Sequence, residues 1–296
     1  MPELPGPDPD PAPPPGVPRD PWADVTPSGG VPPMPWPPDP GPAAGPPPGY
    51  LPPDPDEPPP VELWRVVGDV PPWGSVILLL AWALMFAGFV WRRDLGDAAA
   101  YIAHGASLAQ PVTRADAWRL LASTFVHEDL AHLFFNSLAM VVFGPAVERI
   151  FGRAAFLTVF TLGGLIASLA SVAWRFAHAA TGAHLSIGAS GALFALAGAL
   201  LTGAWRLRHR LAVGRARALA AAILFFSVPA IAQGFQRVGI DNAAHLGGIA
   251  SGLVLGAVVP LSDRLGGPRP SWALRALGAL AALALAACYV RAWRGG

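Results

Sequence analysis

Four polar residues lie in long apolar stretches of this sequence, and together they offer the chemistry of a nucleophilic catalyst. They are His132, Asn136, Ser190 and His245. Polar and ionisable groups are costly inside a membrane-spanning helix, so each one marks a candidate functional site. A serine hydroxyl is a weak nucleophile until a neighbouring base takes its proton, and neutral histidine suits that task best. We therefore predict that Ser190 is a nucleophile and that His245 is its base.

The residues around Ser190 suit the same chemistry. Gly188 and Gly191 flank it closely, and such small residues allow a tight turn and the close approach of a substrate backbone. The first backbone N–H groups of a helix lack partners within the helix and can donate to a developing oxyanion. His132 and Asn136 are four residues apart and so share one helix face, from which their side chains would complete an oxyanion hole.

Each of these residues also has a purely structural interpretation. Ser190 alone is typical of a helix N-cap. His245 or Asn136 alone is typical of a polar side chain that hydrogen-bonds to a neighbouring helix. The functional interpretation is favoured because all four residues fall in equivalent positions, as described below.

The other polar residues near these positions are assigned structural roles. His127 lies five residues before His132 and would face elsewhere on a continuous helix, so we interpret it as a structural residue. Asp241, one turn before His245, would be placed to orient that ring, but it or Asn242 is more typical of a helix cap. The remaining histidines are predicted to lie in solvent, in loops or at helix edges; they are His104, His178, His184 and His209.

The apolar stretches predict a membrane protein. Of the 296 residues, 53% are hydrophobic and 13% are charged, against about 25% charged in an ordinary soluble domain. A spanning helix needs about 20 mostly apolar residues. Seven stretches qualify, at about 74–91, 130–147, 155–174, 188–205, 217–234, 242–260 and 273–290. Residues 92–129 hold mixed polar and aromatic side chains and are predicted to form an interfacial loop.

The order of these stretches brings the four polar residues to one side of the bilayer. The second, fourth and sixth predicted helices run in the same direction, and each carries its polar residues within its first two turns. His245 also lies on one face with Gly248, Gly252 and Gly256, and glycines at this spacing let two membrane helices approach closely. We expect that face to pack on the fourth predicted helix, which is rich in Gly and Ala.

The first 60 residues have a different composition. They hold 27 of the 35 prolines and nine acidic residues against one arginine, Arg19. Such a segment buries too little apolar surface to offset ordering, and proline blocks helices, so we predict a disordered, partly polyproline II tail. A solvated spacer is the favoured interpretation, and a docking site for a proline-binding partner is the alternative for residues 1–60.

Charge sets the predicted orientation and narrows the partners. Arginines are densest between residues 206 and 217, which by the positive-inside rule places this loop and, by alternation, the N-terminal tail in the cytoplasm. Arg92, Arg93, Arg291 and Arg294 would then lie outside, against the rule. A net charge of +1 gives no indication of a nucleic-acid partner, and the single cysteine, Cys288, excludes an internal disulfide.

These motifs, in this order, resemble the rhomboid family of intramembrane serine proteases over about residues 74–260. The pattern begins with Trp118-Arg119 and continues through His127, His132 and Asn136. It then runs through Glu148-Arg149, Gly188-Ala-Ser-Gly191 with Phe194, and Asp241-Asn-Ala-Ala-His-Leu-Gly-Gly248. A lone Gly-x-Ser-Gly is a weak signal, but the ordered set is highly specific. The seventh predicted helix suggests the six-plus-one form of the family.

The resemblance implies an all-α polytopic fold and a Ser190–His245 dyad without an acidic third member. It implies that His132, Asn136 and the backbone around Ser190 form the oxyanion hole, and that Phe194 packs on the His245 ring. It also implies that Trp118 and Arg119 brace a loop half-embedded in the membrane, and that Gly188 and Gly191 support the active site. The fifth helix and the loop before the sixth would act as a lateral gate and cap.

We accordingly expect a multi-pass protein of the cell membrane that cleaves the spanning segments of single-pass proteins, with no metal or organic cofactor. The predicted units are a tail at 1–65, a six-helix core at 66–262, and a linker with the seventh helix at 263–296. A catalytically silent rhomboid-like protein that binds membrane clients is the alternative. A transporter is disfavoured, since the sequence shows neither an internal repeat nor ionisable residues at the bilayer midplane.

Overall fold

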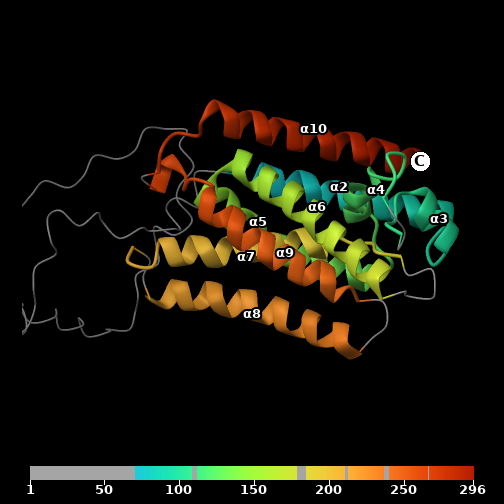
Figure 1. Ribbon diagram of the computed structural model, residues 1–296, viewed down its shortest axis with the longest axis horizontal. Coiled ribbons are helices and arrows are strands. Elements are labelled where there is room, and N and C mark those ends of the chain that lie inside the picture. The colour runs from blue at the N-terminus through green and yellow to red at the C-terminus, as the bar shows by residue number, and fades with distance from the viewer. Residues whose placement is uncertain (1–70, 109–111, 179–184, 211–212, 237–239, 266) are drawn as a thin grey trace, which may run out of the picture. The chain divides into compact units, whose positions relative to one another are not determined.

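The computed structural model describes residues 71–108, 112–178, 185–210, 213–236, 240–265 and 267–296. The predictions for the proline-rich tail and for His184 fall outside these residues. Within them the chain is helical and forms no strand, and the only pairing of extended backbone is a single bridge between Ser107 and Ser186. The predicted all-α fold is therefore confirmed (Figure 1).

A long helix covers most of each of the seven predicted apolar stretches. The helices are α2 (Trp73–Arg92), α5 (Leu130–Phe151), α6 (Arg153–Ala177), α7 (Ser190–Arg206), α8 (Val213–Gln236), α9 (Asn242–Val258) and α10 (Trp272–Arg294). The predicted interfacial loop holds the short α3 (Ala98–Ala103), α4 (Arg119–Ala122) and 3₁₀ helix η1 (Ser123–Phe125), while η2 (Asp263–Leu265) precedes α10. In the part of the chain that the structure describes, five helices are long and apolar enough to cross a membrane, namely α2, α5, α6, α8 and α10. The chain is thus a multi-pass membrane protein.

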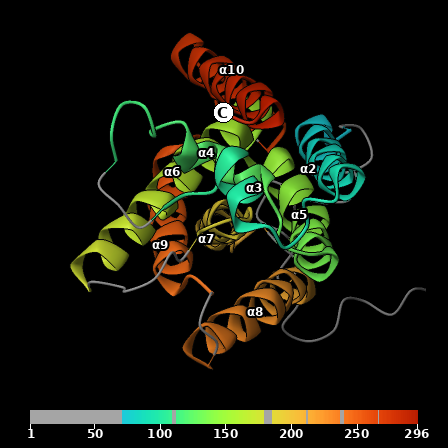
Figure 2. The ribbon, with the colours of Figure 1, turned by 90° about the vertical axis from the view of Figure 1, so that its right-hand side faces the viewer.

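The two long helices outside that group, α7 and α9, carry Ser190 and His245. Each has 17 residues, which is at the lower end of the length that spans a bilayer. Helix α7 lies at the centre of the bundle, with the other long helices around it (Figure 2). Residues 191–200 of α7 are all buried, so its backbone is enclosed by protein rather than by lipid. In contrast, α8 is mostly exposed: only 11% of its most apolar part is buried.

Small residues let α9 lie directly against α7. A Cβ atom added at Gly252 would collide with the carbonyl oxygen of Ala195, and one added at Gly248 would collide with the carbonyl oxygen of Gly191. From the other side, a Cβ at Gly198 would lie 2.9 Å from the backbone nitrogen of Leu253. The glycine face predicted for the helix of His245 therefore meets α7 at backbone distance, as expected.

Aspartates cap two of the helices that carry the polar residues. The Asp129 carboxylate accepts a hydrogen bond of 2.7 Å from the backbone N–H of His132, at the start of α5. The Asp241 carboxylate accepts one of 3.0 Å from the N–H of Ala244, at the start of α9. An N-cap acceptor satisfies one of the donors that a helix start leaves free. The N-termini of α5 and α9 are thereby fixed at one end of the bundle.

The opposite end has its own charged contacts. The buried Glu148 carboxylate accepts 2.8 Å and 3.2 Å hydrogen bonds from the N–H groups of Ser75 and Gly74, at the start of α2. The Arg206 guanidinium donates to the carbonyl oxygens of Gly256 and Val259, at the end of α9, over 2.8 Å and 2.6 Å. Carboxylates at helix N-termini and cations at C-termini are both favourable placements with respect to the helix dipole.

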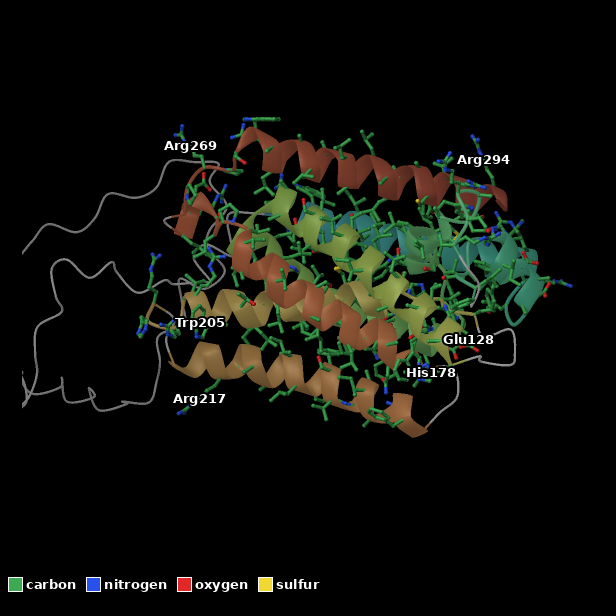
Figure 3. The ribbon with its side chains drawn as sticks, in the orientation of Figure 1. Glu128, His178, Trp205, Arg217, Arg269 and Arg294 are labelled. Carbon is green, nitrogen blue, oxygen red and sulfur yellow. The ribbon has the colours of Figure 1, made fainter. Side chains whose placement is uncertain are left out.

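The predicted orientation can be tested at two exposed residues that mark the two ends of the bundle, Glu128 and Arg217 (Figure 3). In a Cys288→Ser background, we expect Arg217→Cys to react with an impermeant maleimide only from the cytoplasmic side. Glu128→Cys should react only from the opposite side, and both should react fully once the membrane is permeabilised. Labelling of Glu128→Cys from the cytoplasm would reverse the assignment.

Candidate active site

The starts of α7 and α9 bring Ser190 and His245 together. Ser190 is the first residue of α7, and His245 lies in the first turn of α9. The Ser190 hydroxyl lies 3.0 Å from Nε2 of His245, which is a hydrogen-bonding distance. His245 is buried, with 4% of its surface exposed. A hydroxyl and an imidazole at this separation are in reach for proton transfer, as a nucleophile and its base must be.

The orientation of the His245 ring comes from an aromatic contact. The Phe194 ring stacks on the imidazole with a centroid separation of 4.2 Å and an interplanar angle of 17°. Phe194 lies one turn after Ser190 on the same helix, so α7 supplies both the hydroxyl and the surface that holds the ring. The stacking also closes one face of the imidazole to solvent.

The Asp241 carboxylate does not hydrogen-bond to the imidazole ring of His245. Its carboxylate caps α9 through Ala244 and also accepts from the hydroxyls of Ser171, on α6, and Ser186, before α7. Among the described residues, Nδ1 of His245 is buried and has no hydrogen-bond partner. The expectation that Asp241 caps the helix is therefore confirmed, and its carboxylate joins α6, α9 and the segment before Ser190.

His132 and Asn136 face the backbone just before Ser190. Gly188 has a φ of +102°, a conformation that favours glycine. A Cβ atom added there would lie 2.6 Å from Cε1 of His132 and 3.3 Å from Nδ2 of Asn136. Only a residue without a side chain lets the backbone pass this close to both groups. The structure thus places two potential donors beside the segment that leads into Ser190.

Asn136 retains unused donor capacity. Its side chain is buried, with 6% of its surface exposed, and Nδ2 has no hydrogen-bond partner among the described residues. A buried amide N–H without a partner is costly, and such groups in native structures mark strain, a functional role or a missing ligand. An acceptor bound beside Gly188 would satisfy it.

His127 lies in the segment before α5 and is packed, as its structural assignment predicted. It is 1% exposed, and its ring lies 5.5 Å from the Trp82 ring and 5.3 Å from the His132 ring. Burial lowers the pKa of His127 to about 3. The ring is therefore neutral at physiological pH, and it supports His132 by packing rather than by carrying a proton.

Trp118 and Arg119 lie at the start of α4. The Arg119 guanidinium donates to the carbonyl oxygens of Ile102 and Ala106 and forms an ion pair of 3.2 Å with Asp116. The Trp118 ring packs on Gly105, where an added Cβ would lie 2.9 Å from it. The two side chains therefore hold together parts of the α2–α5 connection that are more than ten residues apart.

The assignment of His104 to solvent is wrong. Its side chain is 8% exposed, its Nδ1–H donates to the carbonyl oxygen of Ala292 near the end of α10, and its ring lies 5.0 Å from that of Phe89. Nothing near His104 in the sequence signals a contact with residues almost 190 positions away. His178 and His209 are exposed as predicted.

Two kinds of group that hold the backbone near Ser190 and His245 could not be predicted from the sequence. The first is the pair of serines on Asp241, Ser171 and Ser186, since serine is common in membrane helices and loops. The second is the carbonyl oxygen of Ser123, which accepts a 2.9 Å hydrogen bond from the N–H of Gly188. Backbone carbonyls carry no sequence signal at all.

A family model for the Rhomboid domain matches residues 114–261, which are 148 of the 296 residues. The match covers Ser190, His245, His132 and Asn136. The chain belongs to the rhomboid family. Membership explains why an Ala-rich membrane bundle carries this ordered set of polar residues, and it confirms the resemblance.

Curated rhomboid relatives include proteins described as proteases. Rhomboid protease GluP of Bacillus subtilis is 33% identical over 160 residues, which are 54% of this chain and 29% of GluP. RHOMBOID-like protein 5 of Arabidopsis thaliana is 29% identical over 171 residues, 57% of this chain and 52% of that protein. Rhomboid protease AarA of Providencia stuartii is 26% identical over 202 residues, 63% of this chain and 70% of AarA. The chain thus matches less than a third of GluP and about half of RHOMBOID-like protein 5.

The role of Gly188 in this rhomboid site can be tested with a matched pair of variants. Gly188→Ala adds both backbone strain and a collision with His132, so we expect a lower melting temperature and loss of any activity that depends on the site. Gly96 also has a positive φ, +85°, but nothing lies within 4 Å of an added Cβ. Gly96→Ala should therefore cost only the strain of about 1–2 kcal/mol. Equal effects of the two variants on unfolding and activity would show that His132 and Asn136 do not constrain this backbone.

Proposed function

We propose that the protein is an intramembrane serine endopeptidase that cleaves the spanning segments of single-pass membrane proteins. The observation that carries the proposal is the 3.0 Å contact between the Ser190 hydroxyl and Nε2 of His245 at the starts of two adjacent helices. Family membership and relatives described as proteases support it. Ser190 is the nucleophile and His245 is the general base.

In the first step, Ser190 Oγ attacks the carbonyl carbon of the scissile peptide bond while its proton moves to Nε2 of His245. The carbonyl double bond opens, and its oxygen takes the negative charge. Stacking on Phe194 keeps the imidazole in place as it becomes positively charged. No carboxylate hydrogen-bonds to Nδ1 among the described residues, so the proposed catalytic unit is a dyad rather than a triad.

The oxyanion is stabilised by donors on the other side of Ser190. The Asn136 amide has a free N–H beside Gly188, and His132 lies next to it on the same helix face. The first backbone N–H groups of α7 add donors, because a helix start leaves them without partners in the helix. Donors that are fixed before the reaction stabilise the transition state more than the substrate, which is what lowers the barrier.

The second half of the reaction reverses the proton movement. The tetrahedral intermediate collapses, the carbon–nitrogen bond breaks, and the His245 imidazolium donates its proton to the departing amine. Water then attacks the ester on Ser190, with His245 taking its proton, and the second collapse releases the carboxylic acid and the free serine. Each step uses His245 alternately as base and acid.

Burial of the site favours a membrane substrate. A helical spanning segment shields its carbonyls by internal hydrogen bonds, and unwinding it in lipid leaves backbone groups without partners. The polar groups of Ser190, His132 and Asn136 lie within the first two turns of their helices, near one end of the bundle. Such a polar site near one membrane face lowers the cost of unwinding. Residence in the cell membrane, with the N-terminus in the cytoplasm, is part of the proposal.

The dyad predicts the effect of removing either member. Ser190→Ala and His245→Ala should each abolish cleavage of a model spanning segment in detergent while the protein stays folded. The double variant should lose little more than either single one, because members of one catalytic unit act together. Cleavage and melting temperature are to be measured on the same preparations.

Two matched variants serve as controls for this experiment. Ser251→Ala removes a buried hydroxyl that bonds within its own helix, to the carbonyl of Gly248, and His178→Ala removes an exposed imidazole. Both should cleave like the wild type. A folded wild-type protein that binds spanning segments without cleaving them would instead support the silent, client-binding alternative, and cleavage by Ser190→Ala would refute the mechanism.

Asn136 gives the sharpest test of the oxyanion assignment. Loss of one oxyanion donor typically lowers kcat by about 10²–10³, so we expect Asn136→Ala to lower kcat strongly and to leave KM nearly unchanged. Because Nδ2 has no partner in the described residues, the variant should lose little stability. A lowered melting temperature with unchanged kcat would show that Asn136 only joins helices.

A further inference from the structure

The last turns of α10 contact the connection between α2 and α5 at three separate places. The guanidinium of Arg291 lies 4.4 Å from the centroid of the Trp118 ring. The Tyr289 ring meets the Phe125 ring edge-on, with centroids 5.2 Å apart. The carbonyl oxygen of Ala292 accepts the hydrogen bond from His104. Figure 2 shows α10 above α4 at this end of the bundle.

The same connection holds the backbone of the active site. Trp118 opens α4, which continues directly into η1, where the carbonyl of Ser123 accepts the N–H of Gly188 over 2.9 Å. Nearby, Ser107 exchanges two backbone hydrogen bonds of 3.0 Å and 2.9 Å with Ser186. Backbone hydrogen bonds from the connection therefore hold the segment that leads into Ser190.

The two sets of contacts share a short stretch of chain. Phe125 and Ser123 belong to the same 3₁₀ helix, so the residue that touches Tyr289 and the residue that holds Gly188 are two positions apart. Trp118 lies one residue before α4, and a second guanidinium, that of Arg119, lies 4.9 Å from its ring centroid. Arg291 is itself exposed, and a cation–π contact at an exposed site is weaker than one shielded from water, so the packing of Tyr289 on Phe125 is the stronger of the two contacts. A shift of α10 would therefore also move α4 and η1.

We propose that α10 is a positioning element for the active site, acting through Tyr289 and Arg291. These two side chains hold α4 and η1 so that the Ser123 carbonyl fixes Gly188 between Ser190 and the donors His132 and Asn136. The inference rests on the proposed function. The matched family domain ends at residue 261, so the inference assigns a role in catalysis to a helix that lies beyond this domain. Neither side chain touches the substrate.

The experiment compares variants of α10 with conservative replacements at the same sites. Tyr289→Ala and Arg291→Ala should each lower kcat by about 3- to 10-fold with little change in KM, since a misplacement of about 1 Å costs up to about 10² in rate. Tyr289→Phe keeps the ring and Arg291→Lys keeps the charge, so both should recover most of the rate. Arg294→Ala, at an exposed arginine one turn after Arg291, should match the wild type.

Two further readouts separate positioning from a loss of folded protein. All rates are to be measured well below the lowest melting temperature, and the rate at which a fluorophosphonate labels Ser190 should fall in parallel with kcat. In addition, Arg291→Ala should lower kcat by a smaller factor in an Asn136→Ala background than in the wild type, because the two changes act on one oxyanion site.

The outcomes distinguish the two levels of the proposal. A wild-type protein that neither cleaves nor reacts with the probe overturns the proposed function itself. An active wild type, with Tyr289→Ala and Arg291→Ala as fast as Arg294→Ala, overturns the role of α10 alone. A third outcome is that the α10 variants are slow but their fold-losses in kcat multiply with the fold-loss of Asn136→Ala. This result would show that α10 does not act on the oxyanion site.

Discussion

The candidate active site depends on the direct contact between α7 and α9. Lipid offers no hydrophobic driving force between helices, so membrane helices associate through close packing and hydrogen bonds. Here the glycines at 248 and 252 bring α9 onto the carbonyls of Gly191 and Ala195. At that separation, residues at the starts of both helices meet without long side chains between them. The 3.0 Å distance from Ser190 to His245 is a consequence of this backbone contact.

Once α7 and α9 are joined, a small number of polar contacts fix their ends. Asp241 ties the start of α9 to α6 and to the segment before Ser190. The Ser123 carbonyl holds Gly188 from the other side. Such bonds resist rearrangement because a broken one would leave unpaired groups in a region with little water. The helices thereby present Ser190 at one place with respect to His132 and Asn136.

The sequence was sufficient to predict the helices and the end of the bundle at which the polar residues lie, for identifiable reasons. Apolar length gave the spans, helical spacing gave the shared face of His132 and Asn136, and chain direction put Ser190 and His245 at the same end. His104 was misplaced because its partner, the carbonyl of Ala292, is a backbone atom far away in the chain. The contacts of Tyr289 and Arg291 were equally hidden, since an aromatic residue and an arginine at a helix end are typical of any membrane interface.

The enclosure of α7 has a consequence for how the protein is made. At 17 residues, α7 spans about 26 Å at 1.5 Å per residue, less than the roughly 30 Å hydrocarbon core. Its stability in lipid therefore comes from neighbours, and its nearest one, α9, is synthesised only after α8. Until α9 has been synthesised, α7 therefore lacks the neighbour that meets it at backbone distance. A chain that ends before α9 also lacks His245, so the proposed pair of Ser190 and His245 forms only when α9 joins α7.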